Sequence, residues 1–146
     1  MNTQEYIKIT SQKDIDDFIE QSNALHDGYV LSVQFLRRGF KRLDSGALEV
    51  CPGESELTIK ILITSIWDTV IELHFKGVSE WQVFDNSWDI FGTAVSVSDN
   101  GQIVWTDGET TDEATRKDGS YVVAQSMEYC FCEDHRQYGN FLEGNK

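Results

Sequence analysis

The chain has 146 residues, of which 40% are hydrophobic, and it carries 25 acidic against 12 basic side chains for a net charge of −13. This composition excludes a disordered chain and suits one domain of ordinary size. No apolar run approaches the ~20 residues of a membrane-spanning helix, and the first residues lack the features of a secretory signal. We therefore expect a cytoplasmic single domain over residues 1–146, with a polar tail over 133–146 that frays.

The acidic excess restricts the classes of partner. Nucleic acids and anionic membranes attract cationic surfaces, so we expect neither. A basic protein or a cation would be attracted, although the same charge is also explained by solubility alone. The three cysteines, Cys51, Cys130 and Cys132, are an odd and low number, which fits a reducing compartment and predicts no disulfide.

An amphipathic helix is predicted over residues 11–25. Thr10 or Ser11 suits an N-cap, and Asp14, three residues after Ser11, stands where a capping box carries Glu. Apolar residues then recur at helical spacing: Ile15, Phe18, Ile19 and Leu25. The stripe predicts that the helix packs on a sheet. We expect the helix to end at His26-Asp27-Gly28, with Gly28 in the left-handed conformation.

The strongest strand signal runs from Leu57 to Val78. Residues 57–64 and 69–76 each alternate between two faces, and the connection between them is short enough for a hairpin. Other strand candidates are 5–10, 29–35, 48–50, 79–84, 94–98, 102–106 and 121–132. In the last of these, alternation places Tyr121, Val123, Met127, Tyr129 and Phe131 on one face.

Turn signals lie between these strands. Asn100-Gly101 predicts a hairpin, and residues 107–119 predict a polar, mobile loop. The only basic cluster surrounds Gly39: Arg37, Arg38, Lys41 and Arg42. Short connections favour antiparallel pairing. The fold class predicted is α+β, with a curved, mainly antiparallel sheet of about seven strands and one N-terminal helix packed on it.

Two pairs of potential metal ligands stand out. His26-Asp27 is like the metal-binding pair of phosphohydrolases, but we expect it to bond loop backbone instead, because further His ligands are scarce. Cys130 and Cys132 point to the same side of a strand, as in half of a zinc site, but no second Cys pair exists. We expect both thiols to face a packed layer, and no metal or cofactor to be bound.

Catalytic signals are weak. His74 is expected to be a solvated partner in cross-strand charge pairing, and no motif combines a nucleophile with a base. An enzyme is therefore not the favoured interpretation.

Aromatic residues are dense around Asp85 and Asp89. Core packing is one interpretation of this cluster, and an exposed patch that anchors a basic partner is the other. The candidate partner-binding residues are Trp81, Asp85, Trp88 and Asp89, with Asp107, Glu109, Asp112 and Glu113 as a rim. The competing acidic surface is the helix, with Asp14, Asp16, Asp17 and Glu20.

Two short motifs carry a family resemblance. They are Leu25-His26-Asp27-Gly28 at the head of a strand, and Leu73-His74-Phe75-Lys76-Gly77-Val78 at the end of the central hairpin. Their order, over residues 20–130, resembles that of small acidic α+β immunity proteins of bacterial toxin systems and of neighbouring uncharacterised families. The resemblance implies binding rather than catalysis and assigns no site residues.

The favoured function is thus a non-catalytic cytoplasmic binding protein for a basic partner such as a toxin. The alternatives are a small ligand-binding module or enzyme of unknown reaction, a nucleic-acid mimic with spaced carboxylates, or a domain with another function altogether.

Overall fold

The computed structural model describes residues 5–66, 69–84, 89–132, 135–140 and 142. The strands in this part of the chain are β1 (Ile7–Lys8), β2 (Gly28–Leu36), β3 (Phe40–Arg42), β4 (Leu48–Val50), β5 (Glu56–Ile63), β6 (Thr69–Gln82), β7 (Ala94–Val97), β8 (Ile103–Thr106) and β9 (Tyr121–Cys132). The helices are α1 (Gln12–Gln21) and α2 (Glu113–Arg116), with 3₁₀ turns η1 (Asn23–Leu25), η2 (Pro52–Glu54), η3 (Thr64–Ile66) and η4 (His135–Tyr138). Neither helix is long and apolar enough to span a bilayer, and the described chain holds no other candidate.

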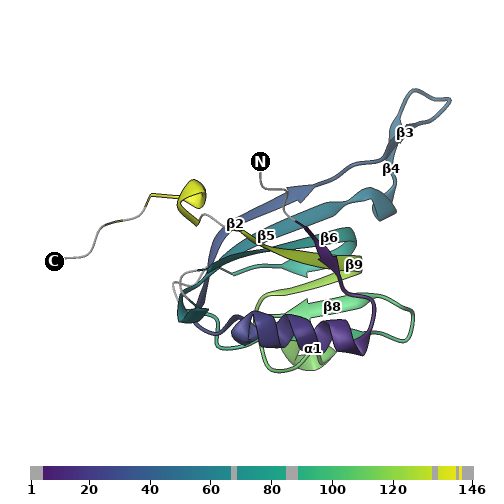
Figure 1. The fold of residues 1–146 in the computed structure, drawn as a ribbon. Helices are drawn as coiled ribbons and strands as arrows, with labels where there is room; N and C mark the ends of the chain where they lie inside the picture. The colour runs from purple at the N-terminus through teal and green to yellow at the C-terminus, as the bar shows by residue number, and fades with distance from the viewer. Residues whose placement is uncertain (1–4, 67–68, 85–88, 133–134, 141, 143–146) are drawn as a thin grey trace.

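One open sheet dominates the described structure. Its seven strands follow the order β2-β5-β6-β9-β8-β7, and β1 also pairs with β9. Every pairing among the described strands is antiparallel. The helix α1 lies across one face of this sheet (Figure 1). The predicted α+β architecture, with a mainly antiparallel sheet and an N-terminal helix, is confirmed.

The centre of the core is the inner face of β5, β6 and β9. Four residues of β5 are fully buried on this face, and three of β6 lie beside them: Leu57, Ile59, Ile61 and Ile63, then Ile71, Leu73 and Phe75. The helix α1 covers the face, with the Phe18 ring 5.0 Å from the ring of Tyr129. Ile15 is buried and Ile19 packs against the same cluster, as the predicted stripe required. Each such side chain contributes about 1.5–3 kcal/mol by burial.

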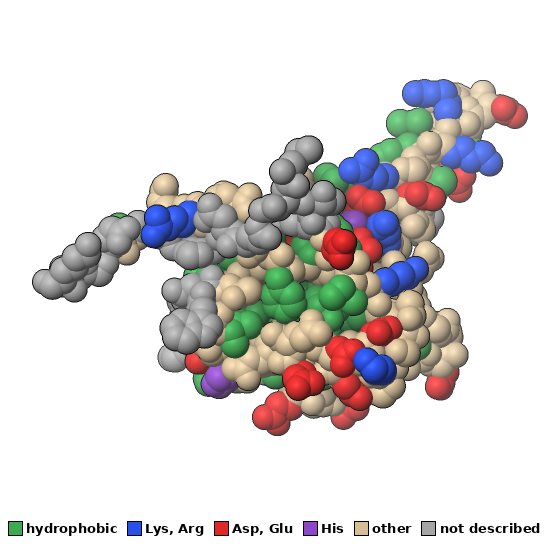
Figure 2. Space-filling model, in the orientation of Figure 1, with side chains coloured by type: hydrophobic (Ala, Val, Ile, Leu, Met, Phe, Trp, Pro, Cys, Tyr) green, Lys and Arg blue, Asp and Glu red, His purple; other side chains and the backbone are tan. Residues whose placement is uncertain are grey.

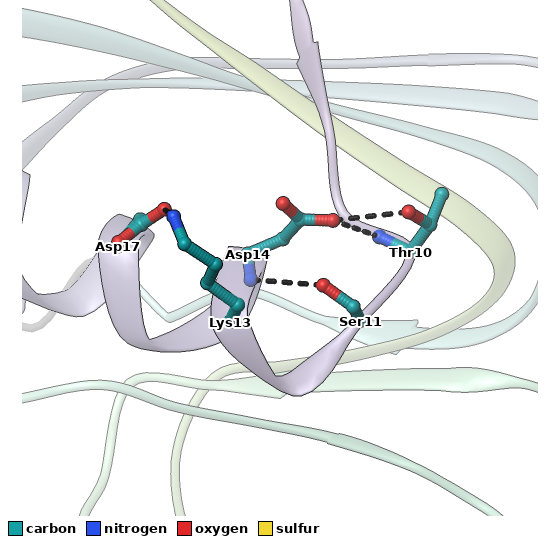
Figure 3. A network of polar contacts seen from close by, with 5 residues as sticks. All are labelled: Thr10, Ser11, Lys13, Asp14 and Asp17. Atoms are coloured by element: carbon teal, nitrogen blue, oxygen red, sulfur yellow. Dashed lines mark hydrogen bonds and ion pairs between the residues drawn. The ribbon is translucent and has the colours of Figure 1, made fainter.

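The N-terminus of α1 is capped by a variant of the capping box (Figure 3). The Ser11 hydroxyl accepts a hydrogen bond from the Asp14 backbone N–H at 3.2 Å. Asp14 reaches back one residue further than in the usual box, and its carboxylate accepts from the backbone N–H of Thr10 at 2.9 Å. This hydrogen bond, the largest effect on that carboxyl, lowers the pKa of Asp14.

The prediction for the end of the helix is wrong. The helix α1 ends at Gln21. The backbone of the following turn η1 is left-handed, with φ of 52° at Asn23 and 55° at both Ala24 and Leu25. Leu25 is fully buried, so this turn aims an apolar side chain into the core, where burial offsets the conformational cost. Gly28 does not have positive φ; a Cβ there would lie 2.7 Å from the carbonyl oxygen of Leu25.

The strand predicted over residues 79–84 is instead the end of β6. The strand continues through Gly77, which has φ +66°, and a bulge lies between Val78 and Glu80. The inward face therefore changes phase along β6, because Phe75 and Val78 both enter the main core.

The neighbouring strand β9 changes phase too, so the expected single face is wrong. Val122, Ala124, Met127 and Tyr129 join the main core. Tyr121 and Val123 form a second cluster with Val104. The change of face in β9 follows from the irregularity at Gly77 in the strand paired with it. The sequence pattern of β9 alone does not reveal this irregularity.

A hairpin stands out from the sheet beyond the end of β2 (Figure 1). It consists of β3 and β4, which pair only with each other in the described chain. We call residues 37–50 the arm. It carries the predicted basic cluster, and Phe40 and Leu48 on it are more than half exposed, at 53% and 56%.

We predict that Phe18→Ala lowers the free energy of unfolding by about 3–5 kcal/mol, the usual loss for a buried Phe. Urea unfolding followed by circular dichroism measures it. The exposed Glu20 on the same helix supplies the control, because Glu20→Ala should change stability by no more than about 0.5 kcal/mol. Equal losses for both variants would show that α1 does not pack through Phe18.

Gly77 gives a second stability test. A Cβ at this position would lie 2.6 Å from the side-chain carbonyl carbon of Gln125, and the positive φ adds strain of about 1–2 kcal/mol. Gly77→Ala should therefore destabilise the protein, and less so in a Gln125→Ala background, where the clash is gone but the strain remains. Urea unfolding of the unaltered protein and the three variants measures the clash and the strain separately, and an equal cost of Gly77→Ala in the two backgrounds would refute the contact with Gln125.

Candidate binding surface

The predicted polar loop between β8 and β9 is tied to the sheet. We call residues 107–119 the acidic loop; it contains α2. From β6, the side-chain amide of Gln82 donates to the carbonyl oxygens of Lys117 at 2.9 Å and Gly119 at 3.0 Å. From β7, Ser96 donates to the hydroxyl of Thr111 at 2.8 Å. These bonds hold the loop against β6 and β7 and give it a defined shape.

Asp107 closes the base of this loop. Its carboxylate accepts a hydrogen bond from the backbone N–H of Ser120 at 3.0 Å. Burial raises the pKa of Asp107, and the hydrogen bond from Ser120 opposes the rise. Asp107 is thus a half-buried structural residue of the loop rather than the exposed rim charge that was predicted.

The basic side chains of the loop already have an acidic partner. Glu80 of β6 lies 4.0 Å from a terminal nitrogen of Arg116 and 3.7 Å from the ammonium of Lys117. The same carboxylate accepts a hydrogen bond from the Tyr121 hydroxyl at 2.8 Å. Glu80 therefore draws both loop cations toward the strand.

What remains on the loop is uncompensated negative charge. A half-open depression of about 300 Å³ is lined by Asp107, Glu109 and Asp118 together with Arg116. Four carboxylates of the loop are exposed and form no ion pair with any other described residue: Glu109, Asp112, Glu113 and Asp118. The surface is concave and acidic, which suits a cationic side chain of a partner.

The predicted aromatic anchor lies elsewhere. Trp81 is 38% exposed and stacks on Phe35 of β2, with the ring centroids 5.4 Å apart. The guanidinium of Arg37 lies 5.3 Å from the centroid of the same Phe35 ring. Asp89 is half-buried. Asp85 and Trp88 lie outside the described residues.

Trp81 and the acidic loop therefore do not form the single surface predicted. Successive residues of a strand point to opposite faces, so Trp81 points away from the face on which Glu80 meets Arg116. Glu80 was missed as a site residue. The alternation rule predicts that Glu80 and Trp81 point to opposite faces of the strand. The sequence does not show which cations Glu80 meets.

The competing acids of α1 are mostly engaged within the helix. Figure 2 shows acidic side chains gathered along α1. Asp16 accepts a hydrogen bond from Gln12 at 3.0 Å, Asp17 pairs with Lys13 at 2.9 Å (Figure 3), and Asp14 caps the helix. Three of the four predicted helix acids are thus already partnered.

A network of titratable groups lies on the outer face of the sheet. Buried Glu72 accepts a hydrogen bond from the Tyr6 hydroxyl. The Cys130 sulfur lies 3.6 Å from the same carboxylate oxygen, and the Lys60 ammonium lies 3.8 Å from its other oxygen. Burial, the larger effect, and the negative charge of Glu72 together raise the pKa of Cys130 to about 12. This thiol stays protonated at neutral pH, and its nucleophilicity is low.

His74 has the cross-strand partner that was predicted. It lies directly opposite Glu128 on β9, with Nδ1 2.8 Å from a carboxylate oxygen. The pair is half-buried rather than solvated. Next to it, the side chains of Cys130 and Cys132 are buried, as expected for residues facing a packed layer.

The tail was predicted to fray, but one part of it, η4, covers the outer face of the sheet. The Tyr138 hydroxyl in η4 donates to the Cys132 sulfur at 3.0 Å. The ammonium of Lys60 lies 4.4 Å from the centroid of the Tyr138 ring, a cation–π contact. The turn is therefore packed onto the sheet.

The side chain of His26 contacts loop backbone, as predicted, whereas the Asp27 carboxylate lies 3.6 Å from His26 Nε2 and, among the described contacts, only the backbone of Asp27 bonds the loop. A ring nitrogen of His26 lies 3.1 Å from the carbonyl oxygen of Phe91, and the backbone N–H of Asp27 donates to Ile90 at 2.8 Å. No group of three or more potential ligands gathers as a metal site within the described part of the chain.

Comparison with protein-family models, with curated proteins and with solved structures finds no match for this chain.

The raised pKa of Asp107 predicts a pH dependence. The folded state holds this proton more tightly than the unfolded state, so stability falls as pH rises from about 3.9 through the folded pKa. Asp107→Asn keeps an acceptor for Ser120 but removes the buried charge. Thermal melts should therefore show a higher Tm for Asp107→Asn at pH 7, with the difference vanishing below about pH 3.9. The exposed Asp118→Asn is the control, and an equal gain there would refute the burial effect.

Thiol labelling tests the outer-face network. In the folded protein at pH 8, iodoacetamide should modify half-exposed Cys51 well before Cys130, because thiolate is the reactive form. Mass spectrometry of tryptic peptides gives the order. Labelling of Cys130 as fast as Cys51, before unfolding, would contradict the buried and protonated thiol.

Proposed function

We propose that this protein is a non-catalytic, cytoplasmic binding protein that neutralises a basic protein partner, such as a toxin. The observation that supports this function is the set of exposed carboxylates on the acidic loop that form no ion pair with another described residue, two of which, Glu109 and Asp118, line the depression. Glu80 holds the loop cations, Arg116 and Lys117, against the strand. The outward side of the loop therefore keeps its negative charge.

The loop is a better binding surface than the helix for two reasons. It is concave, with room for a side chain in its depression of about 300 Å³, whereas α1 presents a convex cylinder. Its exposed acids also have no internal partner in the described chain, whereas binding at α1 would compete with the Lys13–Asp17 pair and the Asp14 cap. A partner lysine or arginine would meet less competition at the loop.

The chemistry of such a site is electrostatic. Exposed carboxylates raise the association rate of a basic partner and select against acidic ones. The hydrogen bonds from Gln82 and Ser120 hold the loop in shape before the partner arrives, which reduces the entropy lost on binding.

The groups on the outer face support a binding role over catalysis. The Cys130 thiol is held protonated, and His74 is committed to Glu128. An active site needs side chains that face a common reacting atom. The side chains on the outer face bond with one another instead.

The test compares two double charge reversals that change the net charge equally. Glu109→Lys/Glu113→Lys alters the loop, and Asp16→Lys/Glu20→Lys alters the exposed side of α1. A fluorescent decalysine peptide serves as the basic probe in anisotropy titrations at about 0.1 M salt, where screening limits charge effects to about 10 Å. We expect the loop variant to lose about tenfold in affinity, or about 1.4 kcal/mol, and the helix variant distinctly less. An equal or larger loss at the helix would refute the loop as the binding surface.

A further inference from the structure

The strand β2 forms one edge of the sheet, and among the described residues only Ile90 pairs with its outer side. Ile90 meets the beginning of this edge, where its backbone N–H donates to the Gly28 carbonyl at 2.7 Å. From Tyr29 to Leu36, no described strand lies on the outer side of β2. Tyr29 and Val33 are 44% and 38% exposed. The edge therefore offers backbone donors and acceptors for another strand.

The sequence of β2 lacks two of the usual protections of an edge, charged residues and proline. Edge strands commonly carry charged residues or proline that block pairing with another chain, but Gly28–Leu36 contains neither. A bulge lies between Val30 and Ser32, and beyond it the register with β5 is regular from Ser32 to Leu36. This regular portion can accept a further antiparallel strand.

The charges at the two ends of β2 are complementary. Asp27 precedes the strand, and Arg37 and Arg38 follow it. Arg37 has no acidic partner among the described residues, whereas Arg38 pairs with Glu56 at 3.2 Å. If β2 pairs antiparallel with a copy of itself about Gln34, Arg37 of each strand lies opposite Leu31 of the other, so the arginine end of one strand runs toward the Asp27 end of its partner.

We propose that β2 is a self-association edge, at which two copies of this chain pair antiparallel about a two-fold axis at Gln34, the centre of Ser32–Leu36. The two sheets then form one continuous sheet. Such an interface is isologous, so it closes at two copies. Backbone hydrogen bonds between the two edges supply the affinity. This inference is independent of the proposed function.

The arm favours a second copy as the occupant. Residues 37–50 hold four basic and two acidic side chains, a net charge of +2, so the rest of the chain holds −13 − 2 = −15. The arm continues beyond the end of β2 (Figure 1) and carries basic side chains (Figure 2). Antiparallel pairing directs each positive arm along the negative body of the other copy. At 0.15 M salt, charges more than about 8 Å apart are largely screened, which reduces the repulsion between two whole chains of the same sign.

Gln34 allows a test that separates pairing from folding. It is exposed, lies opposite Thr58 on the polar face of the sheet, and falls within the proposed axis region. Across a two-fold axis, Gln34→Lys places two positive charges together, and Gln34→Glu places two negative charges together. A mixture of the two variants places opposite charges together instead. Gln21→Lys, at the exposed end of α1, is the matched control.

Sedimentation velocity over a concentration series, with circular dichroism melts as a check on folding, measures the outcome. We expect the unaltered chain and Gln21→Lys to form the same dimer. Each Gln34 variant alone should raise the dimer dissociation constant at least tenfold, and the equimolar mixture should restore it to within about threefold. The inference is overturned by a monomer at all concentrations, by open assemblies larger than a dimer, by a Gln34→Lys effect no larger than that of Gln21→Lys, or by a mixture that does not recover.

Discussion

The apolar inner face shared by β5, β6 and β9 is the constraint on which the rest of the structure depends. Its side chains, from Leu57 to Phe75, are fully buried, and burial of this kind is the main favourable term in folding. The helix α1 covers the face through Phe18 and Tyr129. The left-handed turn at η1, with Leu25 in the core, returns the chain to the sheet edge as β2.

Charge in this protein is sorted by burial. Inside, Glu72 is partnered by Tyr6, Cys130 and Lys60, because an unpaired buried carboxylate would be costly. At the surface, Glu80 takes up both cations of the acidic loop. The net charge of −13 is therefore not spread evenly over the surface. On the acidic loop, the exposed carboxylates have no described cation to offset them.

The two proposed surfaces lie on different parts of the sheet. The self-association edge is β2, at one end of the strand order, whereas the acidic loop joins β8 to β9 on the other side of the central strands. Three strands separate β2 from β8. Pairing of two copies through β2 would leave both acidic loops open, so a dimer could bind a basic partner at each end.

The sequence by itself determined the features that depend on near neighbours. The alternation in 57–76, the Ser11–Asp14 cap and the Asn100-Gly101 hairpin, as well as the α+β class, follow from local patterns. Only the tertiary structure decided the early helix end, the change of phase at Gly77, the contacts of Glu80 and which strand lies at the edge. Each of these depends on residues far apart in the chain: Leu25 with the core, Gly77 with Gln125, Glu80 with Arg116. Periodicity shows which residues share a face of one strand, but it carries no information about what packs against that face.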